Sequence, residues 1–413
     1  THGSFLKMFI IALLVVNILL VSADQAKHNG HCDSNKETCK DNNVGETYIY
    51  EKKKLLFYDV NPPEGFNLRR DVYMRFAIML AEAQARGEKA EWQLVLPPWH
   101  NMYHWKTRSF HDSPKPWSMF FNVSTLNTFV EVLEMYQVMQ VSGKYGLRID
   151  TLYVLQNYDE PFENGIFKEK WAVVGPCSYE GNFWGYRNIT ATNIICVQLQ
   201  GSISQIWDVI NLNPDDKKVM FAHGEIPLHT SYGTQTFWNC RKSMQFSQEL
   251  IIAAEMYIRK KLDCHITKCT NYLAIHWRRQ DFHHSNRSTS IGGTVKQVDA
   301  AIKKNSLDVR NIFIASDGSF DELKLLKLEF KLFGYTAHVY LPNVDKYIDG
   351  QIAIIEQIIC SRSAYFIGTY ESTFTYRIQE EREILGFDSD TTFNRLCPDD
   401  GECEKHSRWT IVH

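Results

Sequence analysis

Short apolar runs alternate with longer amphipathic stretches through the second half of the chain. The apolar runs are 272–277 (YLAIHW), 311–316 (NIFIAS), 337–341 (AHVYL) and 364–368 (AYFIG), and the amphipathic stretches are 294–304, 320–330, 351–360 and 373–385. Buried strands that alternate with helices predict a parallel sheet in a doubly wound α/β domain. In such a sheet, ligands bind outside the carboxyl ends of the strands.

The first half begins with a similar unit but is less regular. The pattern predicts strands at Leu55–Val60, Trp92–Leu96, Leu152–Leu155 and Val219–Ala222, and helices near Leu68–Arg86, ending at Gly87, and at Lys242–Lys261. Aromatic residues with interspersed Gly and Pro fill much of 116–211, where the pattern assigns no elements in detail. Their aromatic side chains are candidates for a surface that binds a macromolecular substrate.

These patterns divide the chain into five parts. They are 1–23, a tag remnant plus signal peptide; 24–46, a polar lead-in; 47–263, an N-terminal Rossmann-like domain; 264–387, a C-terminal Rossmann-like domain; and 388–413, a cysteine-bearing segment. The apolar run from Met8 to Leu20 and the small residues up to Ala23 predict a secretory signal cleaved after Ala23. This run is short for a membrane span, so we expect no stable span after cleavage, although a retained signal anchor is an alternative.

The cysteines agree with an oxidising compartment. Ten cysteines include three close pairs, Cys32/Cys39, Cys264/Cys269 and Cys397/Cys403, which leaves four for longer links: Cys177, Cys196, Cys240 and Cys360. Disulfides fit this spacing better than a zinc site does. N-glycosylation sequons at Asn122, Asn188 and Asn286 also predict exposure to the lumen of the secretory pathway.

Overall charge and missing motifs exclude several classes of function. The formal net charge of -3 provides no long-range attraction to nucleic acid or anionic lipid. The chain lacks the motifs of P-loop ATPases, standard dehydrogenases, serine hydrolases and HExxH zinc proteases. The DSD sequence at 388–390 lies beyond the last predicted helix, and we interpret it as structural.

Two predicted strand ends carry candidate anion ligands. Arg278 and Arg279 follow the strand at 272–277, and a guanidinium group matches phosphate oxygens, although a structural ion pair with Asp281 or a solvated loop fits equally well. Ser372 and Thr373 open the helix after the strand at 364–368, where their hydroxyl groups either cap the helix or hold a phosphate. Two such sites at one sheet edge favour a nucleotide ligand.

The first predicted strand runs into NPPEG, which places Glu64 in an irregular connection before a long helix. Proline removes backbone donors and glycine permits unusual dihedral angles, so this loop has a restricted shape. From its spacing alone, Glu64 is an ordinary exposed loop carboxylate.

Five motifs in order change that interpretation. They are YDVNPPEGFNLRRDVY, LVLPPW, HWRRQDF, IIEQIIC and GTYESTFTYRIQEEREILG, and they run from near Leu55 towards the C-terminus. Together they resemble protein O-fucosyltransferases, specifically the type that modifies thrombospondin type 1 repeats. The resemblance implies a GT-B architecture of two Rossmann-like domains in the secretory pathway, with the endoplasmic reticulum lumen as the expected location. It implies inverting transfer of fucose from GDP-fucose to Ser or Thr of a folded repeat, without an essential metal.

The resemblance also implies roles for individual residues of this chain. Glu64 matches the catalytic base, and Arg278 matches the arginine on the leaving diphosphate. The remaining matches bind the donor: Gly65, Phe66, Asn67, His276, Asp281, Glu356, Ser372, Thr373 and Phe374. Glu356 stands where the related enzymes have Asp as the carboxylate that reads the guanine edge. The extra methylene group changes the reach of that contact.

Two other functions are compatible with the same residues. One is a sister transferase that acts on EGF-like repeats, and the other is a luminal binding module or chaperone that has lost turnover. Intact Glu64 and Arg278 favour an enzyme.

Overall fold

The computed structural model describes residues 53–102, 105, 113–163, 165–265, 268–283, 289–341 and 346–399, together with 403, 408 and 411. The predicted signal peptide, the polar lead-in, the Cys32/Cys39 pair and the sequon at Asn286 lie outside these residues. The side chain of Asp281 lies outside the description as well.

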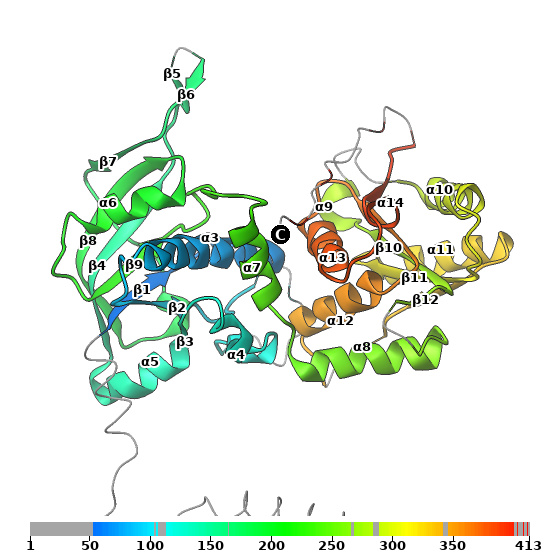
Figure 1. Cartoon of the computed structure of the whole chain (residues 1–413), viewed down its shortest axis with the longest axis horizontal. Coiled ribbons are helices and arrows are strands. Elements are labelled where there is room, and N and C mark those ends of the chain that lie inside the picture. The colour runs from blue at the N-terminus through cyan, green and yellow to red at the C-terminus, as the bar shows by residue number, and fades with distance from the viewer. Residues whose placement is uncertain are drawn as a thin grey trace, which may run out of the picture. The chain divides into compact units, whose positions relative to one another are not determined.

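Seven strands form the first sheet, in the order β3-β2-β1-β9-β4-β8-β7. Their bounds are β1 Lys54–Tyr58, β2 Trp92–Leu96, β3 Val132–Glu134, β4 Leu147–Gln156, β7 Lys170–Val174, β8 Ile189–Gln200 and β9 Lys218–Ala222. All neighbours pair in parallel except β7, which is antiparallel to β8. The helix α3 (Phe66–Ala85) connects β1 to β2 and lies across this sheet (Figure 1), which confirms the predicted βαβ unit.

Shorter elements surround the first sheet. The helices are α4 Val123–Leu126, α5 Met135–Ser142, α6 Ile206–Ile210 and α7 Gln235–Ser243, with 3₁₀ turns at Trp117–Met119, Gly143–Tyr145, Phe183–Gly185 and Ile203–Gln205. A small hairpin pairs β5 (Phe162–Glu163) with β6 (Ile166–Phe167). These elements fill most of the region that the sequence pattern left unassigned.

Five parallel strands form the second sheet, in the order β12-β11-β10-β13-β14. Their bounds are β10 Tyr272–Trp277, β11 Asn311–Ser316, β12 Thr336–Val339, β13 Tyr365–Thr369 and β14 Asn394–Leu396. The helices are α8 Gln248–Lys261, α9 Gln280–His283, α10 Ile291–Lys304, α11 Phe320–Leu332, α12 Asp349–Ser361, α13 Thr373–Ile384 and α14 Ser389–Thr392. The predicted strand and helix order of this half is confirmed.

The single helix predicted at Lys242–Lys261 is wrong. The chain leaves the helical conformation at Met244, and α8 begins only after the extended N-cap Ser247. In between, Phe246 forms a β-bridge with Phe121, and Ser247 donates its backbone N–H to the Phe120 carbonyl at 2.9 Å. These long-range hydrogen bonds replace those of a continuous helix, and helix propensity alone does not predict them.

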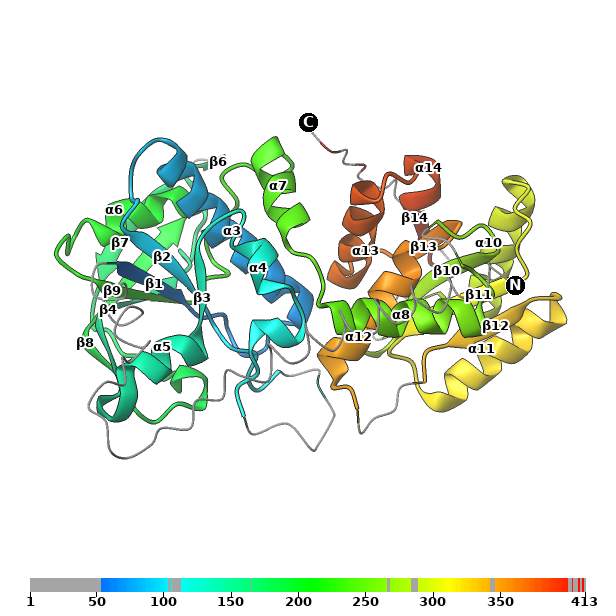
Figure 2. The same cartoon turned by 60° about the horizontal axis from the view of Figure 1, so that its bottom comes forward.

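The helix α8 runs beside α12 (Figures 1 and 2) and packs against the second sheet. The Tyr257 ring contacts Phe313 of β11, and its hydroxyl group donates to the Val339 carbonyl at 2.9 Å. The boundary at 263/264 is not tested by these contacts and stays a prediction.

Three disulfides join Cys177 to Cys196, Cys264 to Cys269 and Cys397 to Cys403. Both close pairs within the described residues are therefore confirmed. Cys240 and Cys360 do not form the expected longer links, because both are buried free thiols. Cys240 lies in α7, which packs against α3, and Cys360 lies in α12, which packs against the second sheet.

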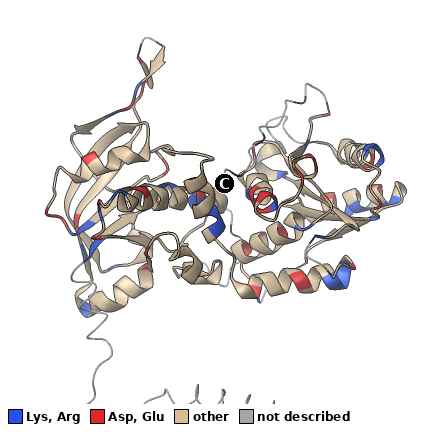
Figure 3. Cartoon of the chain, viewed as in Figure 1, with Lys and Arg blue, Asp and Glu red and all other residues tan. Residues whose placement is uncertain are grey.

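Charged residues of both signs are interspersed over the elements in Figure 3, in keeping with the near-zero net charge. No helix within the described part of the chain is long and apolar enough to cross a membrane.

Candidate active site

The NPPEG loop leaves the carboxyl end of β1 and enters α3 through Gly65, which has extended dihedral angles. The backbone N–H of Glu64 donates to the Asn61 carbonyl at 2.9 Å. The buried Arg69 guanidinium then donates to three carbonyls of the loop, those of Glu64 at 3.1 Å, Asn61 at 3.2 Å and Pro62 at 3.3 Å. One arginine from the first turns of α3 thus fixes the backbone on both sides of the prolines.

The Glu64 carboxyl group is half-buried and lines a cavity of about 430 Å³ together with Asn61, Gln156, His223 and Glu225. Partial burial raises the pKa of Glu64 above its ordinary value, and the Glu225 carboxylate raises it further. Among the described residues, no side chain or backbone donor is hydrogen-bonded to the Glu64 carboxylate. The group is therefore placed to accept a proton from a hydroxyl that enters the cavity.

Glu225, which follows β9, connects the end of this strand to the NPPEG loop. It accepts a hydrogen bond from the Asn61 backbone N–H at 3.1 Å, and its other oxygen lies 3.4 Å from His223 Nδ1. The hydrogen bond with Glu225 is the largest cause that raises the pKa of His223, and the same contact helps to lower the pKa of Glu225. An ionised Glu225 next to Glu64 keeps the latter carboxyl group basic.

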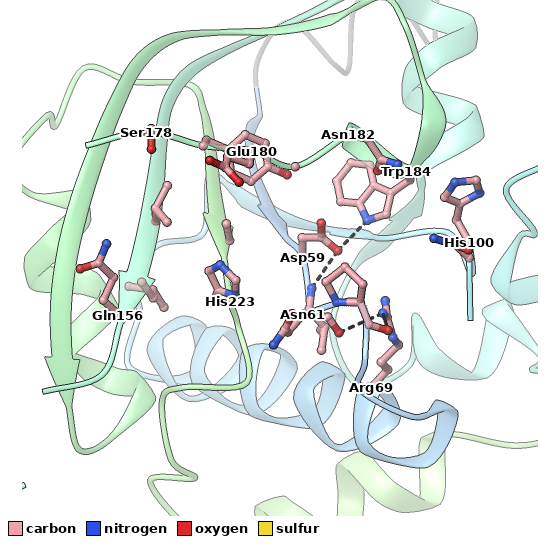
Figure 4. Close-up of a pocket in the computed structure, with 18 residues that line it drawn as sticks. Asp59, Asn61, Arg69, His100, Gln156, Ser178, Glu180, Asn182, Trp184 and His223 are labelled. Carbon is pink, nitrogen blue, oxygen red and sulfur yellow. Dashed lines mark hydrogen bonds between the residues drawn. The ribbon is translucent and has the colours of Figure 1, made fainter. Parts of the chain in front are cut away.

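A larger cavity of about 580 Å³ adjoins the loop (Figure 4) and is lined by Asp59, Arg69, Gln156, Trp184 and His223, among others. Trp184 donates its indole N–H to Asp59 Oδ1 at 2.9 Å, so this ring closes one wall. The segment that carries Trp184 is held at its other end by the disulfide of Cys177. Both cavities lie at the carboxyl edge of the first sheet, where a parallel sheet binds its ligands.

The second group of candidates lies at the carboxyl edge of the second sheet. Arg278 follows β10, and its Nη1 lies 2.9 Å from Asp317 Oδ2, just past β11. Its backbone N–H donates to Thr369 Oγ1 at 3.0 Å, at the end of β13. Three neighbouring strand ends therefore meet at Arg278.

Arg279 has a structural role. It is buried, donates to Glu322 Oε1 at 2.9 Å and to the Thr289 carbonyl at 3.1 Å, and its guanidinium lies 4.4 Å from the Trp277 ring centroid. Of the two arginines, Arg278 is thus the one with a side chain at the strand edge.

His276 is a buried, uncharged residue. Burial, with a smaller effect of Arg278, lowers the pKa of His276 to about 3. Its Nδ1 lies 2.8 Å from Thr375 Oγ1, and its ring stacks on Phe374 with 4.4 Å between the centroids. His276 therefore holds the first turn of α13 against β10.

Ser372 is the N-cap residue of α13 but makes no side-chain capping hydrogen bond. The capping interpretation of its hydroxyl group is therefore wrong. Thr373, the next residue, is exposed, and the first backbone hydrogen bond back to Ser372 comes from Tyr376. The start of α13 thus presents hydroxyl and backbone donors, an arrangement suited to an anion.

Glu356 lies on α12, partly buried near Asp317. Burial, with a smaller effect of the Asp317 carboxylate, raises the pKa of Glu356 to about 8. No hydrogen bond or ion pair with another described residue involves this carboxyl group. A guanine edge offers two N–H donors, for which a carboxylate is a suitable acceptor.

The start of α3 is joined to α12 by hydrogen bonds. Asn67 Oδ1 accepts from Gln357 Nε2 at 2.8 Å and from Arg70 Nη1 at 3.2 Å. Phe66, in contrast, turns its ring into the core, 4.6 Å from the Trp99 ring centroid. The candidate residues of the two sheets are therefore linked through Asn67 and Gln357, the neighbour of Glu356.

The family model for GDP-fucose protein O-fucosyltransferase matches residues 55–385. This chain belongs to that family. It is 37% identical over 400 residues to GDP-fucose protein O-fucosyltransferase 2 of Homo sapiens, covering 88% of this chain and 90% of that protein. The enzyme of the same name from Caenorhabditis elegans is also 37% identical, over 88% of this chain and 92% of its own length. The protein is therefore a glycosyltransferase.

The fold resembles solved fucosyltransferase structures. The crystal structure of POFUT1 in complex with GDP superposes with a TM-score of 0.56 at 15% identity, covering 84% of this chain and 98% of that chain. The structure of POFUT1 in complex with GDP-fucose gives the same values. The expected GT-B-like fold, with two α/β sheets that are parallel except for β7, is confirmed.

Sequence reasoning missed the residues that hold the candidates in place, notably Arg69, Glu225, Asp317 and Gln357. Asp317 follows the predicted strand at 311–316, so the rule that located Arg278 also points to it. Arg69 lies within the YDVNPPEGFNLRRDVY motif. Gln357 lies within the IIEQIIC motif, next to Glu356, whereas Glu225 gives no local signal.

Proposed function

We propose that this enzyme transfers fucose from GDP-fucose to a Ser or Thr hydroxyl of folded thrombospondin type 1 repeats, with inversion at the anomeric carbon. The observation that carries the proposal is Glu64, a half-buried carboxyl group of raised pKa on a loop fixed by Arg69, facing a cavity. The names of the relatives support the donor and the protein acceptor. The motif resemblance supports the repeat class.

Glu64 acts as general base in this mechanism. As the acceptor oxygen bonds to the anomeric carbon, its proton passes to Glu64. The bond from that carbon to the phosphate oxygen breaks, and its electron pair leaves with GDP. Inversion requires base and leaving group on opposite faces of the sugar, as in inverting glycosidases.

Arg278 stabilises the negative charge that grows on the diphosphate. Arg278 Nη1 lies 2.9 Å from Asp317 Oδ2, so a diphosphate at this position shares the guanidinium with Asp317 or displaces it. The first turn of α13, with Ser372, Thr373 and Phe374, holds the phosphates through hydroxyl and backbone donors. Because an arginine and helix N-termini supply this charge stabilisation, we propose that transfer requires no metal. Transfer that persists undiminished in EDTA is the expected result.

The start of α3 and α12 complete the donor site. Gly65, Phe66 and Asn67 face the phosphates through their backbone, and Glu356 accepts from the guanine edge. His276 supports this site from behind through Phe374 and Thr375. Asp281, just past Arg278 in the sequence, belongs to the same proposed donor site.

The acceptor enters on the side of the first sheet. The two cavities next to Glu64, with Trp184 and Gln156 in their walls, support this placement. Of the aromatic residues expected to form an acceptor surface, Trp184 lines a cavity, whereas Trp117 is buried in the core. We propose the endoplasmic reticulum lumen as the place of action, because folded disulfide-bonded repeats and the disulfides among the described residues of this chain both require an oxidising compartment.

GDP release by the purified protein tests the acceptor class. The protein is incubated with GDP-fucose and a folded thrombospondin repeat, a folded EGF-like repeat, or each repeat reduced and alkylated. Release that depends on the folded thrombospondin repeat is the expected result. Release with the EGF-like repeat alone overturns the repeat class, and no release despite GDP binding favours a non-catalytic binding module.

A further inference from the structure

Arg70 is a fully buried arginine that no step of the proposed chemistry uses. Its guanidinium lies among three phenyl rings, 5.2 Å from the Phe121 centroid, 5.4 Å from that of Phe246 and 5.9 Å from that of Phe66. Nε and Nη2 have no hydrogen-bond partner among the described residues. Only Nη1 is engaged, with Gln357 Oε1 at 2.8 Å and Asn67 Oδ1 at 3.2 Å.

This arrangement is costly for stability. Burial lowers the pKa of Arg70 well below its ordinary value, and the nearby Arg241 and Arg377 lower it further. Replacing a buried charged residue by an apolar one of similar volume is often neutral or stabilising. Packing therefore does not explain an arginine at this position, whereas the geometry of its hydrogen bonds does.

Those hydrogen bonds fix the orientation of the Asn67 amide. Arg70 Nη1 and Gln357 Nε2 are both donors, and both point at the same atom of Asn67. Only the amide oxygen accepts hydrogen bonds, so Oδ1 faces Arg70 and Gln357. The Nδ2 group, with two N–H donors, faces away from the triangle that Asn67, Arg70 and Gln357 form. Gln357 is oriented in the same manner, because its Oε1 accepts from Arg70 while its Nε2 donates to Asn67.

The outward Nδ2 group lies at the start of α3. Asn67 is half-exposed, and no acceptor for Nδ2 exists among the described residues. The first backbone hydrogen bonds of the helix are donated by Leu68 and Arg69 to Gly65, which leaves the N–H groups of Phe66 and Asn67 outside that ladder. The amide donors and these backbone donors therefore lie together at the positive end of the helix macrodipole.

We infer that Arg70 and Gln357 are positioning residues that orient the Asn67 amide as a hydrogen-bond donor to the diphosphate of the nucleotide. This inference rests on the proposed donor site and adds to its backbone contacts a side-chain contact with a defined orientation. Because Gln357 follows Glu356 on α12, the same triangle sets the distance between the guanine contact and the phosphate contact.

The variant Gln357→Glu distinguishes an effect on the orientation of the Asn67 amide from an effect on the stability of the fold. Glu still accepts from Arg70, and its charge pairs with the buried guanidinium, but it cannot donate to Asn67 Oδ1 when ionised. The carboxylate instead attracts the Asn67 amide donors inward. We expect the melting temperature to be equal to or above that of the wild type, while GDP affinity falls about tenfold to a hundredfold, the range for one charge-assisted hydrogen bond.

Titration calorimetry with GDP measures this effect without any acceptor. Asn67→Ala is expected to give a similar loss, and Gln357→Glu added to Asn67→Ala is expected to cost nothing further, since the amide is already gone. Arg70→Lys retains the charge but not the planar, multiple-donor geometry of the guanidinium. We expect this variant to lose GDP affinity when Asn67 is present and to cause no further loss in the Asn67→Ala background. Gln351→Glu on the same helix is the matched control, with unchanged affinity.

The outcomes distinguish this inference from the proposed function. Wild-type protein that does not bind GDP contradicts the proposed donor site itself. Wild-type binding with Gln357→Glu at wild-type affinity, or additive losses in the double variant, overturns the positioning role alone.

Discussion

Arg69 Nε donates a hydrogen bond of 3.1 Å to the backbone carbonyl of Glu64, five residues earlier in the chain. The residue proposed as base is thus held through its main chain, which leaves its carboxyl group free to meet the acceptor. A loop with two prolines and a buried guanidinium keeps this position without help from the ligand.

Arg69→Lys tests that support. Lysine retains the positive charge but reaches at most one or two of the three carbonyls, so the loop loses its fixed shape. We expect kcat to fall about tenfold or more, with the KM for GDP-fucose changed less than about threefold. Steady-state kinetics measure both constants. A KM effect alone would place Arg69 in donor binding instead.

The pH dependence of kcat/KM reports the ionisation of Glu64. The base works only when deprotonated, so the rate rises with pH through the pKa of Glu64, which lies above its ordinary value. Glu225→Gln removes a negative charge next to Glu64, while its amide oxygen still accepts from Asn61. We therefore expect the acidic limb of the profile to move to lower pH in this variant. A limb that stays in place would remove the coupling between the two carboxyl groups.

Glu356 links nucleotide affinity to pH. With a pKa of about 8 in the free protein, this group is mostly protonated at neutral pH, and a guanine edge binds its ionised form. GDP binding then releases a proton, so affinity rises with pH up to about 8. Between pH 6.5 and 8.5 we expect a gain in affinity of roughly twentyfold over any trend seen in Glu356→Gln. Calorimetry in buffers of different ionisation enthalpy measures the number of protons released on GDP binding. Identical pH trends of GDP affinity in the wild type and in Glu356→Gln would contradict the guanine contact.

The variant Ser372→Ala distinguishes a helix-capping role of the Ser372 hydroxyl group from a contact between this group and the donor. Loss of a side-chain cap costs about 1 kcal/mol, but Ser372 makes no such hydrogen bond. We expect the free energy of unfolding to change by less than about 0.5 kcal/mol, and the KM for GDP-fucose to rise several-fold. Urea unfolding and donor kinetics are the measurements. Lost stability at unchanged KM would restore the capping role.

Cys240 and Cys360 are expected to resist thiol reagents in the native protein. Burial raises the pKa of both thiols, and the thiolate is the reactive form. Peptide mapping after alkylation should find both residues unmodified before unfolding and modified after it. Labelling of either residue in the folded state would show that its packing opens.

The edge strand β14 (Asn394–Leu396) lies in the segment that was predicted only to carry cysteines. The other four strands of the second sheet were predictable because they read as continuous apolar runs. β8 was not, because residues such as Thr192 and Asn193 interrupt its first half on the exposed side. The break between α7 and α8 depends on the β-bridge from Phe246 to Phe121, a contact that no local pattern contains.

The candidate site divides in the same manner. Glu64 and Arg278 follow strands and lie in motifs that resemble those of the family, so both could be proposed from the sequence, although spacing alone left their roles open. Their supporting residues come from far along the chain: Glu225 lies 164 residues from Asn61, and Gln357 lies 287 residues from Arg70. Tertiary structure brings these pairs together, and local patterns in a single sequence do not reveal which partner each residue meets.

The most direct test of the account compares the wild type with Glu64→Gln in fucose transfer to a folded thrombospondin repeat, measured by mass spectrometry of the repeat. Gln keeps the shape and the loop contacts but cannot accept the proton, so we expect transfer to fall about a hundredfold or more while GDP affinity stays within about threefold. Transfer by Glu64→Gln at a rate close to that of the wild type would contradict the assignment of Glu64 as the base.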